Sequence, residues 1–434
     1  MRKRIYLCLA HMSEAGLEQK YIQEAFQTNW VVPLGPNVDG FEKDLEAFMN
    51  WVPTLAPRDG DSGSGARMHK RVVALSSGTA AVHLALIACG VGPGDEVLVQ
   101  SFTFCASAHP VTYLGATPVF VDSEKETWNM DPDLLEQAIQ DRIAKTGRKP
   151  KAIIPVALYG MPYKIDRILE IANRYDIPVI EDAAEGFGSR YNDQVLGSFG
   201  KYGVLSFNGN KMITTSGGGA LVVGNRDEWN EVMMYATQYR ESYPYYQHEK
   251  IGYNYRMSNI CAGIGRGQMT VVNDHLEHHK HVQKLYEKLL KDVKGVTVHS
   301  QPATGEYDSN YWLCTITLDP KLKIKGQENA YKTIVNGAVG GAAGVIHPAA
   351  AAVTDCQPND NVEALRVFMS DAAIEARPVW KPMHKQPVYK DAPAYVNGVS
   401  EAIFKVGMCL PAGPYVTDED VAYIVETIKK AIAE

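Results

Sequence analysis

The chain has 434 residues, of which 45% are apolar, and a formal net charge of −7; this is enough for a large buried core and predicts two domains. The acidic balance argues against nucleic-acid binding as the main function, because such proteins usually carry a basic surplus. Seven scattered cysteines without a Cys-x-x-Cys pair argue against a disulfide framework and a thiolate zinc site, and favour the cytoplasm.

The first residues of the chain do not predict a membrane protein. Residues 1–11 are basic and then apolar, but the apolar part is too short for the core of a signal peptide. Because no apolar segment of spanning length follows, we expect no membrane partner. The segment is predicted to form a strand or an extended arm.

Helical patterns come next. Apolar residues recur at helical spacing over residues 13–29, where Ser13 can cap a helix. Residues 30–36 contain two prolines and a glycine and are predicted to form a loop. A second amphipathic helix is predicted over 41–51, and the following residues 53–71, rich in Asp, Gly and Ser, are expected to form an exposed, mobile insertion.

From residue 72 onward, short apolar runs alternate with helical segments. This order predicts an α/β domain with a mostly parallel sheet of seven strands, covered by helices on both faces. With the N-terminal helices, we expect this large domain to span residues 1–290. The predicted strands are Val72–Leu75, Glu96–Gln100, Pro118–Val121, Ala152–Val156, Pro178–Glu181, Val204–Phe207 and Ala220–Val223.

The C-terminal part is predicted to form a smaller α/β domain over residues 291–434. A long helical region, 257–291, leads into it. Within it we expect a strand at 312–318 and helices at 361–373 and 417–433. The Gly- and Ala-rich stretch 337–352 lacks the polar bias of a disordered tract and is expected to pack as a small-residue segment.

An acid and a lysine follow two of the predicted strands. Asp182 ends the apolar run that begins at Ile177, and Lys211 follows the strand that ends at Phe207. Ligands of open α/β sheets bind at the carboxyl ends of the strands. An acid that keeps a pyridine nitrogen protonated and a lysine that holds an aldehyde as a Schiff base suit pyridoxal phosphate. Glu185 lies three residues beyond Asp182, so a structural pair of acids in the first turn of a helix competes with a catalytic pair.

The phosphate of such a cofactor needs donors, and one turn can supply them. Ser77, Gly78 and Thr79 follow a strand and open a helix, where unpaired N–H groups and the helix dipole favour an anion. An ordinary N-cap is the competing interpretation. Phe104 follows another strand and can stack on a flat ring, although most such aromatics belong to the core.

Three further patterns carry weaker signals. Gly263-x-Gly265-x-Gly267 lies within a predicted helix without a preceding strand, which argues against dinucleotide binding. A cluster of four histidines on the long helix is expected at the surface, and no metal is predicted. The segment Arg377 to His384 combines cations, an indole and prolines, which suits a loop that holds an anionic or nucleotide-bearing substrate. The histidines are His275, His278, His279 and His281.

Three sequence segments together resemble those of the DegT-type sugar aminotransferases. They are Glu181 to Glu185, Ser206 to Gly219 and Gly252 to Asn259, and the similarity extends over nearly the whole chain. Asn-Gly-Asn-Lys and Thr-Ser-Gly-Gly-Gly are most similar to the bacillosamine branch. That branch aminates C4 of a UDP-linked 4-keto-6-deoxy-N-acetylhexosamine.

This resemblance implies a fold-type I homodimer with active sites at the subunit interface and glutamate as amino donor. Lys211 would form the Schiff base and shuttle a proton, and Asp182 would pair with the pyridinium nitrogen. The cofactor-binding residues would further include Gly78, Thr79, Ser77 and Ser206 at the phosphate, Phe104 on the ring, Glu185 near the 3-hydroxyl and Asn254 from the partner subunit. On the sugar side we expect Trp30, Arg377, Lys381 and His384.

Other functions were weighed on the same residues. A related sugar 3-dehydratase replaces the lysine with histidine, so Lys211 argues against it. A C3 or C4 aminotransferase acting on a dTDP- or GDP-linked keto sugar is an alternative, and a non-catalytic regulatory protein that merely retains the fold is a remoter one. No strand-linked Gly-x-Gly-x-x-Gly supports a dinucleotide-dependent oxidoreductase.

Overall fold

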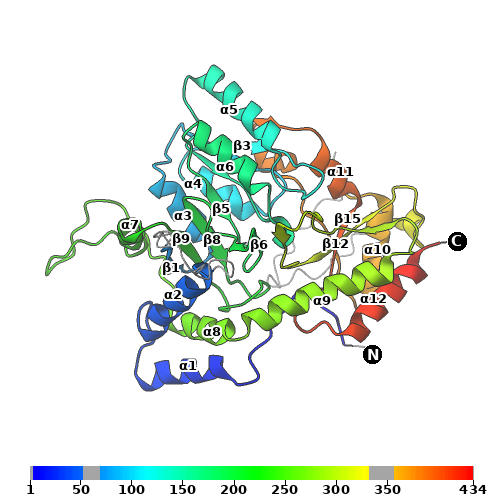
Figure 1. Ribbon diagram of the computed structural model, residues 1–434, viewed down its shortest axis with the longest axis horizontal. Coiled ribbons are helices and arrows are strands. Elements are labelled where there is room, and N and C mark those ends of the chain that lie inside the picture. The colour runs from blue at the N-terminus through cyan, green and yellow to red at the C-terminus, as the bar shows by residue number, and fades with distance from the viewer. Residues whose placement is uncertain (1–2, 52–68, 332–355, 434) are drawn as a thin grey trace, which may run out of the picture.

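The computed structural model describes residues 3–51, 69–331 and 356–433. Its centre is a sheet in two sections, with strand orders β1-β9-β8-β5 and β14-β3-β2-β4. Parallel bridges from Ile153 to Val179 and from Val156 to Asp182 join β4 to β5. Strand β9 runs antiparallel to both of its neighbours, and the other paired strands are parallel. The prediction of a mostly parallel sheet is confirmed (Figure 1).

All seven predicted strands are present, with ends that differ by at most two residues. One edge strand, β14 (Ala394–Tyr395), was not predicted because only two of its residues pair. The seven are β1 (Arg71–Leu75), β2 (Glu96–Gln100), β3 (Thr117–Val121), β4 (Ala152–Ile154), β5 (Ile180–Asp182), β8 (Tyr202–Ser206) and β9 (Gly219–Val223).

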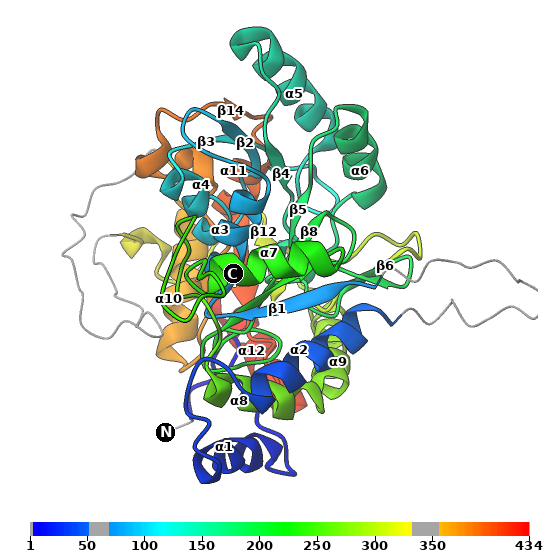
Figure 2. The same ribbon diagram turned by 90° about the vertical axis from the view of Figure 1, so that its left-hand side faces the viewer.

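Side chains of the sheet alternate between two hydrophobic cores. In β1, for example, Val72 and Ala74 enter one core, whereas Val73 and Leu75 enter the other, because successive residues of a strand point to opposite faces. The covering helices lie on both sides of the sheet (Figure 2). The first core includes residues of α2 (Pro36–Met49), α5 (Pro132–Thr146), α6 (Ile165–Arg174) and α8 (Asn259–Met269), and the second those of α3 (Gly78–Ala88), α4 (His109–Tyr113) and α7 (Arg226–Ala236).

The N-terminal helices differ in detail from the prediction. Helix α1 (Leu17–Gln27) begins after Gly16, although Ser13 does accept the Leu17 N–H at 3.1 Å. Helix α2 starts five residues earlier than expected, because Pro36 occupies its first turn, where a missing N–H costs nothing. Both helices pack on α8. The glycines of α8 allow this close packing, because a Cβ on Gly265 would stand 2.7 Å from the Phe41 ring.

The predicted long helix is two helices, α8 and α9 (Val272–Leu290), which are separated at Thr270 and Val271. The expectation that its histidines lie at the surface is wrong for two of them. His275 and His279 are 5% and 0% exposed, and their Nδ1 atoms bond to the carbonyl oxygens of Met212 and Tyr311. In the described part of the chain, no group of His, Cys, Asp and Glu could hold a metal ion.

The C-terminal part builds its own antiparallel sheet, in the order β10-β12-β15-β13. Helix α9 belongs to both parts, because Val272 and Leu276 lie in a core of the large sheet, whereas Val282 and Tyr286 lie in the C-terminal core. A domain boundary at residue 290 therefore stays a prediction. The elements are β10 (Val296–Val298), β12 (Cys314–Leu318), α10 (Asp360–Asp371), β13 (Arg377–Pro378), α11 (Val399–Val406), β15 (Gly407–Leu410) and α12 (Asp418–Ala431).

The remaining elements are short. A small sheet has the order β11-β6-β7. Its strands are β6 (Arg190–Tyr191), β7 (Gln194–Val195) and β11 (Tyr307–Asp308), and the 3-10 turns are η2 (Cys105–Ser107), η3 (Leu158–Gly160), η4 (Gln327–Asn329), η5 (Met383–Lys385) and η6 (Pro387–Tyr389).

The N-terminal residues form the predicted extended arm. Ile5 forms a parallel bridge with Ile374, and the Leu7 carbonyl accepts the N–H of Ala412 at 2.8 Å. Most of the predicted insertion, and all of the Gly- and Ala-rich stretch 337–352, lie outside the described residues. The end of the insertion is an exception, because Lys70 is buried and Arg71 begins β1. Among the described helices, none is long and apolar enough to cross a membrane.

A second acid in β5, Glu181, points away from Asp182 and is fully buried. Its Oε2 accepts the N–H groups of Phe199 at 3.0 Å and Gly200 at 3.4 Å. Burial raises the pKa of Glu181 to about 7, although these hydrogen bonds and the charge of Lys70 oppose the rise. Between the ordinary pKa of a glutamic acid side chain and about pH 7, the folded protein therefore keeps a proton on Glu181 that the unfolded chain has lost.

This proton makes the stability depend on pH. Since the pKa is higher in the folded state, the contribution of Glu181 to the free energy of unfolding is lost as pH rises through about 7. We expect Glu181→Gln to stabilise the protein at pH 8 by roughly 1–3 kcal/mol relative to its effect at pH 4.5. Urea unfolding at both pH values measures this difference. Equal effects of the substitution at the two pH values would contradict the prediction, and Glu136→Gln at the surface is the control.

Candidate active site

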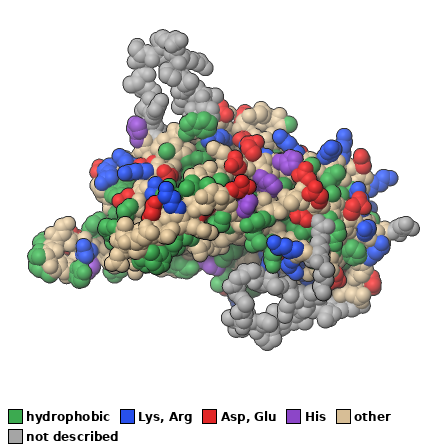
Figure 3. All heavy atoms as spheres, turned by 90° about the horizontal axis from the view of Figure 1, so that it is seen from below, with side chains coloured by type: hydrophobic (Ala, Val, Ile, Leu, Met, Phe, Trp, Pro, Cys, Tyr) green, Lys and Arg blue, Asp and Glu red, His purple; other side chains and the backbone are tan. Residues whose placement is uncertain are grey.

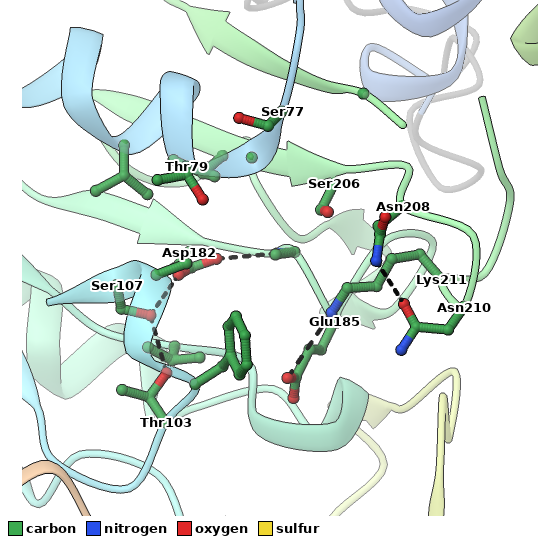
Figure 4. Close-up of a pocket in the computed structure, with 18 of the residues that line it drawn as sticks. Ser77, Thr79, Thr103, Ser107, Asp182, Glu185, Ser206, Asn208, Asn210 and Lys211 are labelled. Carbon is green, nitrogen blue, oxygen red and sulfur yellow. Dashed lines mark hydrogen bonds and ion pairs between the residues drawn. The ribbon is translucent and has the colours of Figure 1, made fainter. Parts of the chain in front are cut away.

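A cavity of about 330 Å³ opens where β5 and β8 end and α3 begins (Figure 4). Sequence segments that are far apart meet here, as expected for the carboxyl ends of parallel strands. Eight of the predicted residues line it: Ser77, Gly78, Thr79, Phe104, Asp182, Glu185, Ser206 and Lys211. Trp380, from the predicted substrate loop, also lines it, and lining residues without a predicted role include Thr103, Ser107, Asn208, Asn210 and Trp312.

Asp182 is the last residue of β5 and is 4% exposed. Its Oδ2 accepts the Ser107 hydroxyl at 2.6 Å, and its Oδ1 accepts the Ala184 N–H at 3.1 Å. The Ser107 oxygen also lies 2.8 Å from the hydroxyl of Thr103. Burial raises the pKa of Asp182, and the two hydrogen bonds and the charge of Lys211 oppose that rise. The carboxylate is thus fixed at the cavity wall, where it can bind a protonated ring nitrogen.

Lys211 follows β8 and enters the same cavity, with 13% of its side chain exposed. Its Nζ lies 3.8 Å from Oε1 of Glu185. The competing interpretation of Glu185 in a pair at a helix start does not hold, because residues 184–188 form turns and its Oε2 accepts the Tyr159 N–H at 2.7 Å. Burial raises the pKa of Glu185, and the nearby Lys211 charge opposes this. Lysine and carboxylate face each other across the cavity (Figure 4).

The start of α3 has the features of an ordinary helix N-cap and also those of a phosphate-binding turn. The Ser77 hydroxyl caps the helix by accepting the Ala80 N–H at 3.0 Å, as an ordinary N-cap does. The same turn lines the cavity opposite Ser206, and a Cβ on Gly78 would stand only 3.1 Å from the Ser206 Cβ. Glycine thus keeps open a cradle of hydroxyl and N–H donors, which fits the phosphate of pyridoxal phosphate.

Filling this cradle is expected to weaken cofactor binding. Gly78→Ala places a methyl group against Ser206, and overpacking of this kind costs roughly 1–2 kcal/mol, about a five- to thirtyfold weaker affinity. Titration of the cofactor-free protein with pyridoxal phosphate, followed by absorbance, measures the change. Gly92→Ala is the matched control, since a Cβ there meets nothing within 4 Å. An unchanged affinity in the Gly78 variant would place the phosphate elsewhere.

Two indoles complete the walls. Phe104, 49% exposed, lies 5.3 Å from Trp380 between ring centres. Trp380 Nε1 donates to Glu185 Oε1 at 3.3 Å, and Trp312 Nε1 donates to the Asn210 carbonyl at 2.7 Å. Trp380 lay within the segment that the sequence indicated as a substrate loop. Nothing in the sequence around Trp312 indicated a place in the site, because its strand belongs to the C-terminal sheet.

A second cavity, of about 320 Å³, shares Thr103, Phe104 and Trp380 with the first. Lys381 lines it, as do His109, Gln386 and apolar side chains. The predicted substrate residue Lys381 is therefore placed beside the candidate active site. One wall, formed by Phe104 and Trp380, separates a compartment with a lysine and two carboxylates from a compartment with a cation.

Three predicted substrate residues do not line either cavity of this chain. His384 is wedged between Ser101, whose Oγ lies 2.7 Å from Nδ1, and Glu401, whose Oε1 lies 3.2 Å from Nε2. Both ring nitrogens have partners in the protein, so the structure supports a structural role instead. Arg377 forms a paired contact with Glu375 at 3.0 and 2.7 Å, and Trp30 lies in an exposed loop.

Asn254, expected from a partner subunit, is exposed and does not line the cavity of its own chain. It forms a bridge with Thr237, the residue after α7, at the base of a long arm, residues 238–253, that leaves the molecule (Figure 1). Hydrophobic side chains gather on this arm (Figure 3), among them Tyr245, Tyr246 and Ile251, which are 61%, 78% and 84% exposed. A second copy of the chain would be needed to bring Asn254 to the phosphate.

Comparisons with known proteins identify the family of the chain. The family model "DegT/DnrJ/EryC1/StrS aminotransferase family" matches residues 65–342 and 343–429. The chain is 40% identical over 432 residues, 99% of this chain and 96% of the other, to EpsN of Bacillus subtilis (strain 168), to which a pyridoxal phosphate-dependent aminotransferase activity is ascribed. It is 32% identical to the GDP-perosamine synthase of Escherichia coli O157:H7, over 98% of both chains.

A solved structure shows the same fold. The crystal structure of a DegT DnrJ EryC1 StrS aminotransferase from Brucella abortus superposes with a TM-score of 0.78, at 26% identity, and covers 97% of this chain and 96% of that one. The likeness spans both parts of the molecule, including the C-terminal sheet that supplies Trp312. The chain therefore belongs to the DegT/DnrJ/EryC1/StrS aminotransferase family, and it is a pyridoxal phosphate-dependent sugar aminotransferase.

Proposed function

We propose that the enzyme transfers an amino group from glutamate to the C4 ketone of a UDP-linked 4-keto-6-deoxy-N-acetylhexosamine, in the cytoplasm, for cell-surface polysaccharide or glycan synthesis. The observation that supports it most is one cavity that holds both Lys211 and Asp182 at the ends of neighbouring strands. The Asn-Gly-Asn-Lys word at 208–211 supports the UDP-linked substrate.

The cofactor, when bound, supplies an aldehyde that carries the amino group and a ring that withdraws electrons from the reacting carbon. Lys211 would hold that aldehyde, and its freed Nζ would accept and return the proton that moves during the transfer. Asp182 would keep the ring nitrogen protonated. Ser77, Gly78, Thr79 and Ser206 would hold the phosphate.

Phe104 and Glu185 complete the set proposed to contact the ring. The exposed face of Phe104 lines the cavity and can stack on a flat heteroaromatic ring. Glu185 also lines the cavity and would lie on the side of the cofactor's 3-hydroxyl, where two anions would repel each other unless one is protonated. The raised pKa of Glu185, caused by burial, favours the protonated carboxyl as that partner.

The nucleotide end of the substrate is assigned to the second cavity. Lys381 lines that cavity and supplies a positive charge for a diphosphate. The two cavities share Phe104 and Trp380, so a substrate with its diphosphate at Lys381 can place its sugar in the first cavity, near Lys211. Lys381→Ala is a direct check on this part of the proposal. A higher KM for the sugar nucleotide, with kcat and the glutamate half-reaction unchanged, supports it.

We further propose that two copies share their active sites. The apolar arm that carries Tyr245 and Ile251 is long and exposed, and Asn254 at its base lies outside the cavity of its own chain. A second copy is the occupant that would cover the arm and receive Asn254 at its phosphate site. Mixing an Asn254→Ala chain with a Lys211→Ala chain tests this, because only shared sites allow one composite site to be intact.

Product analysis with a panel of substrates tests the reaction itself. Purified protein should be yellow, lose its colour on addition of glutamate and regain it with the correct keto sugar. Mass spectrometry of products from UDP-, dTDP- and GDP-linked keto sugars identifies the nucleotide and the position of the new amine. A GDP-linked substrate is the second candidate. It is favoured by the 32% identity to GDP-perosamine synthase, which extends over 98% of both chains. Conversion of GDP- but not UDP-linked sugars would decide for it.

A further inference from the structure

The turn directly before Lys211 carries two carboxamides. The N–H of Lys211 bonds to the carbonyl of Asn208 at 2.9 Å, which closes the turn over residues 208–211. From the C-terminal part of the molecule, Trp312 Nε1 donates to the carbonyl of Asn210 at 2.7 Å. The backbone of the turn is therefore fixed from two sides, although Asn208 and Asn210 themselves are exposed.

The side chains of Asn208 and Asn210 form a pair at the first cavity. Both line it, and Asn208 Nδ2 donates to Asn210 Oδ1 at 3.2 Å (Figure 4). Two carboxamides have four N–H groups in total, and the hydrogen bond between them uses one, so three remain. Among the described residues, no other group accepts these three. We name the two side chains the amide pair.

No arginine lines the first cavity among the residues that the structure describes. The charged side chains on its wall are Asp182, Glu185 and Lys211. Arg377, which the sequence predicted for the substrate, instead pairs with Glu375 at 2.7 Å. An amino acid that reacts at Lys211 must place its α-carboxylate in this cavity, because that group is bonded to the carbon that carries the amine. Neither acid can bind it as an anion, and Lys211 is assigned to the aldehyde.

We propose that the amide pair binds the α-carboxylate of the amino donor. The inference rests on the proposed function, in which glutamate and a keto sugar react in turn at Lys211. Hydrogen bonds from neutral amides to a carboxylate are strengthened by its charge, and two N–H groups can bond to its two oxygens. These bonds take the place of the arginine that the described cavity wall lacks.

Neutral donors suit a site that two unlike substrates occupy in turn. The amino donor brings an anion into the cavity, whereas the sugar ring that follows is uncharged. A fixed arginine would lose both its partner and its water when the sugar replaced the amino acid, and an unpaired charge shielded from water is costly. Carboxamides can bond to a hydroxyl group at the same position. The amide pair therefore serves the first substrate without hindering the second.

Two amides of glutamate test which group the amide pair binds. Isoglutamine carries an uncharged amide in place of the α-carboxylate, and glutamine carries one in place of the side-chain carboxylate. The bleaching of the full-length, cofactor-loaded enzyme by glutamate, with each amide added as a competitor, gives the affinity for all three compounds. Asn210→Ala is expected to weaken binding of glutamate and glutamine roughly five- to fiftyfold, because both keep the α-carboxylate, and to leave that of isoglutamine nearly unchanged.

Further variants separate binding from folding. Asn210→Asp sets a carboxylate against that of the donor and should weaken glutamate binding more than Asn210→Ala does. The reaction of the glutamate-treated enzyme with the keto sugar should change less in both variants, since the sugar ring is uncharged. Ser216→Ala is the matched control, because Ser216 is exposed in the same loop but does not line the cavity. Asn208→Ala gives an independent measurement if the Asn210 variants fail to fold.

The outcomes distinguish this inference from the function on which it rests. Equal losses of affinity for glutamate and isoglutamine overturn the role of the amide pair, and so does an unchanged affinity for glutamate in the variants of both asparagines. In either case the wild-type enzyme still bleaches with glutamate, so the proposed function stands. A wild-type enzyme that keeps its colour with glutamate instead overturns the proposed amino donor.

Discussion

Lys211→Ala is expected to lower kcat by roughly 10⁴-fold or more, because one substitution removes both the covalent anchor and the proton carrier. The side chain enters a cavity that Asp182 and Glu185 also line, and no other lysine of the described residues lines that cavity. The purified variant should be colourless or carry cofactor that dialysis removes. Steady-state kinetics with glutamate and a keto sugar, together with the visible spectrum, measure both effects.

A surface lysine provides the control for this experiment. Lys201→Ala removes an exposed amine near the start of β8 and should leave colour and kcat unchanged. Retention of the spectrum of lysine-bound cofactor in the Lys211 variant would show that another residue forms the bond. The proposed assignment of the reaction to this cavity would then be wrong.

Asp182→Asn is expected to lower kcat by about 10²–10³-fold with a smaller effect on KM. The amide preserves the shape of the side chain but removes the negative charge that keeps the ring nitrogen protonated. The Ser107 hydroxyl, 2.6 Å from Oδ2, would remain able to bond to the amide oxygen, so folding should be retained. Kinetics of each half-reaction and the far-ultraviolet circular dichroism of the variant measure activity and fold separately.

A second buried carboxylate, Asp122, provides the control for this variant, because its charge lies in the core and not in the site. Asp122 is fully buried and accepts the N–H groups of Asn397, Gly398 and Ser400, but it does not line the cavity. Asp122→Asn should lower stability and leave kcat of the folded enzyme unchanged. If both variants lost activity alike, the loss would come from disturbed folding, and the special role of Asp182 would be refuted.

Local patterns carried most of the fold. Each of the seven predicted β-strands of the large sheet is a short apolar run, so the positions of these strands followed from periodicity alone, whereas the two-residue edge strand β14 did not. Positions of helix ends were less predictable, because they depend on neighbours. Gly267, near the end of α8, lies against Glu18 of α1. Pro36 could start α2 because Asn259 accepts the next N–H. Such contacts are not visible in a local window.

The site divides in the same way. Asp182, Lys211 and Gly78 each follow a strand, and the topology of a parallel sheet brings such positions together. Trp312 precedes a strand of a different sheet, so no local signal linked it to Lys211. His384 is a different case: its segment combines cations and an indole, and both nitrogens of its ring contact protein groups, Ser101 and Glu401. Composition indicated the correct loop, and only the fold decided which side chains face the cavity.

The N-terminal arm has a consequence for the order in which the protein is made. Ile5 bonds to Ala373 and Glu375, and Leu7 bonds to Ala412, so these residues find no native partner until the C-terminal sheet has been synthesised. Helices α1 and α2 meet α8 much earlier. Translation therefore releases a nearly complete large sheet while the arm is still unpaired. The last sheet closes only after the ribosome has finished it, and until then the arm is an exposed strand available to chaperones.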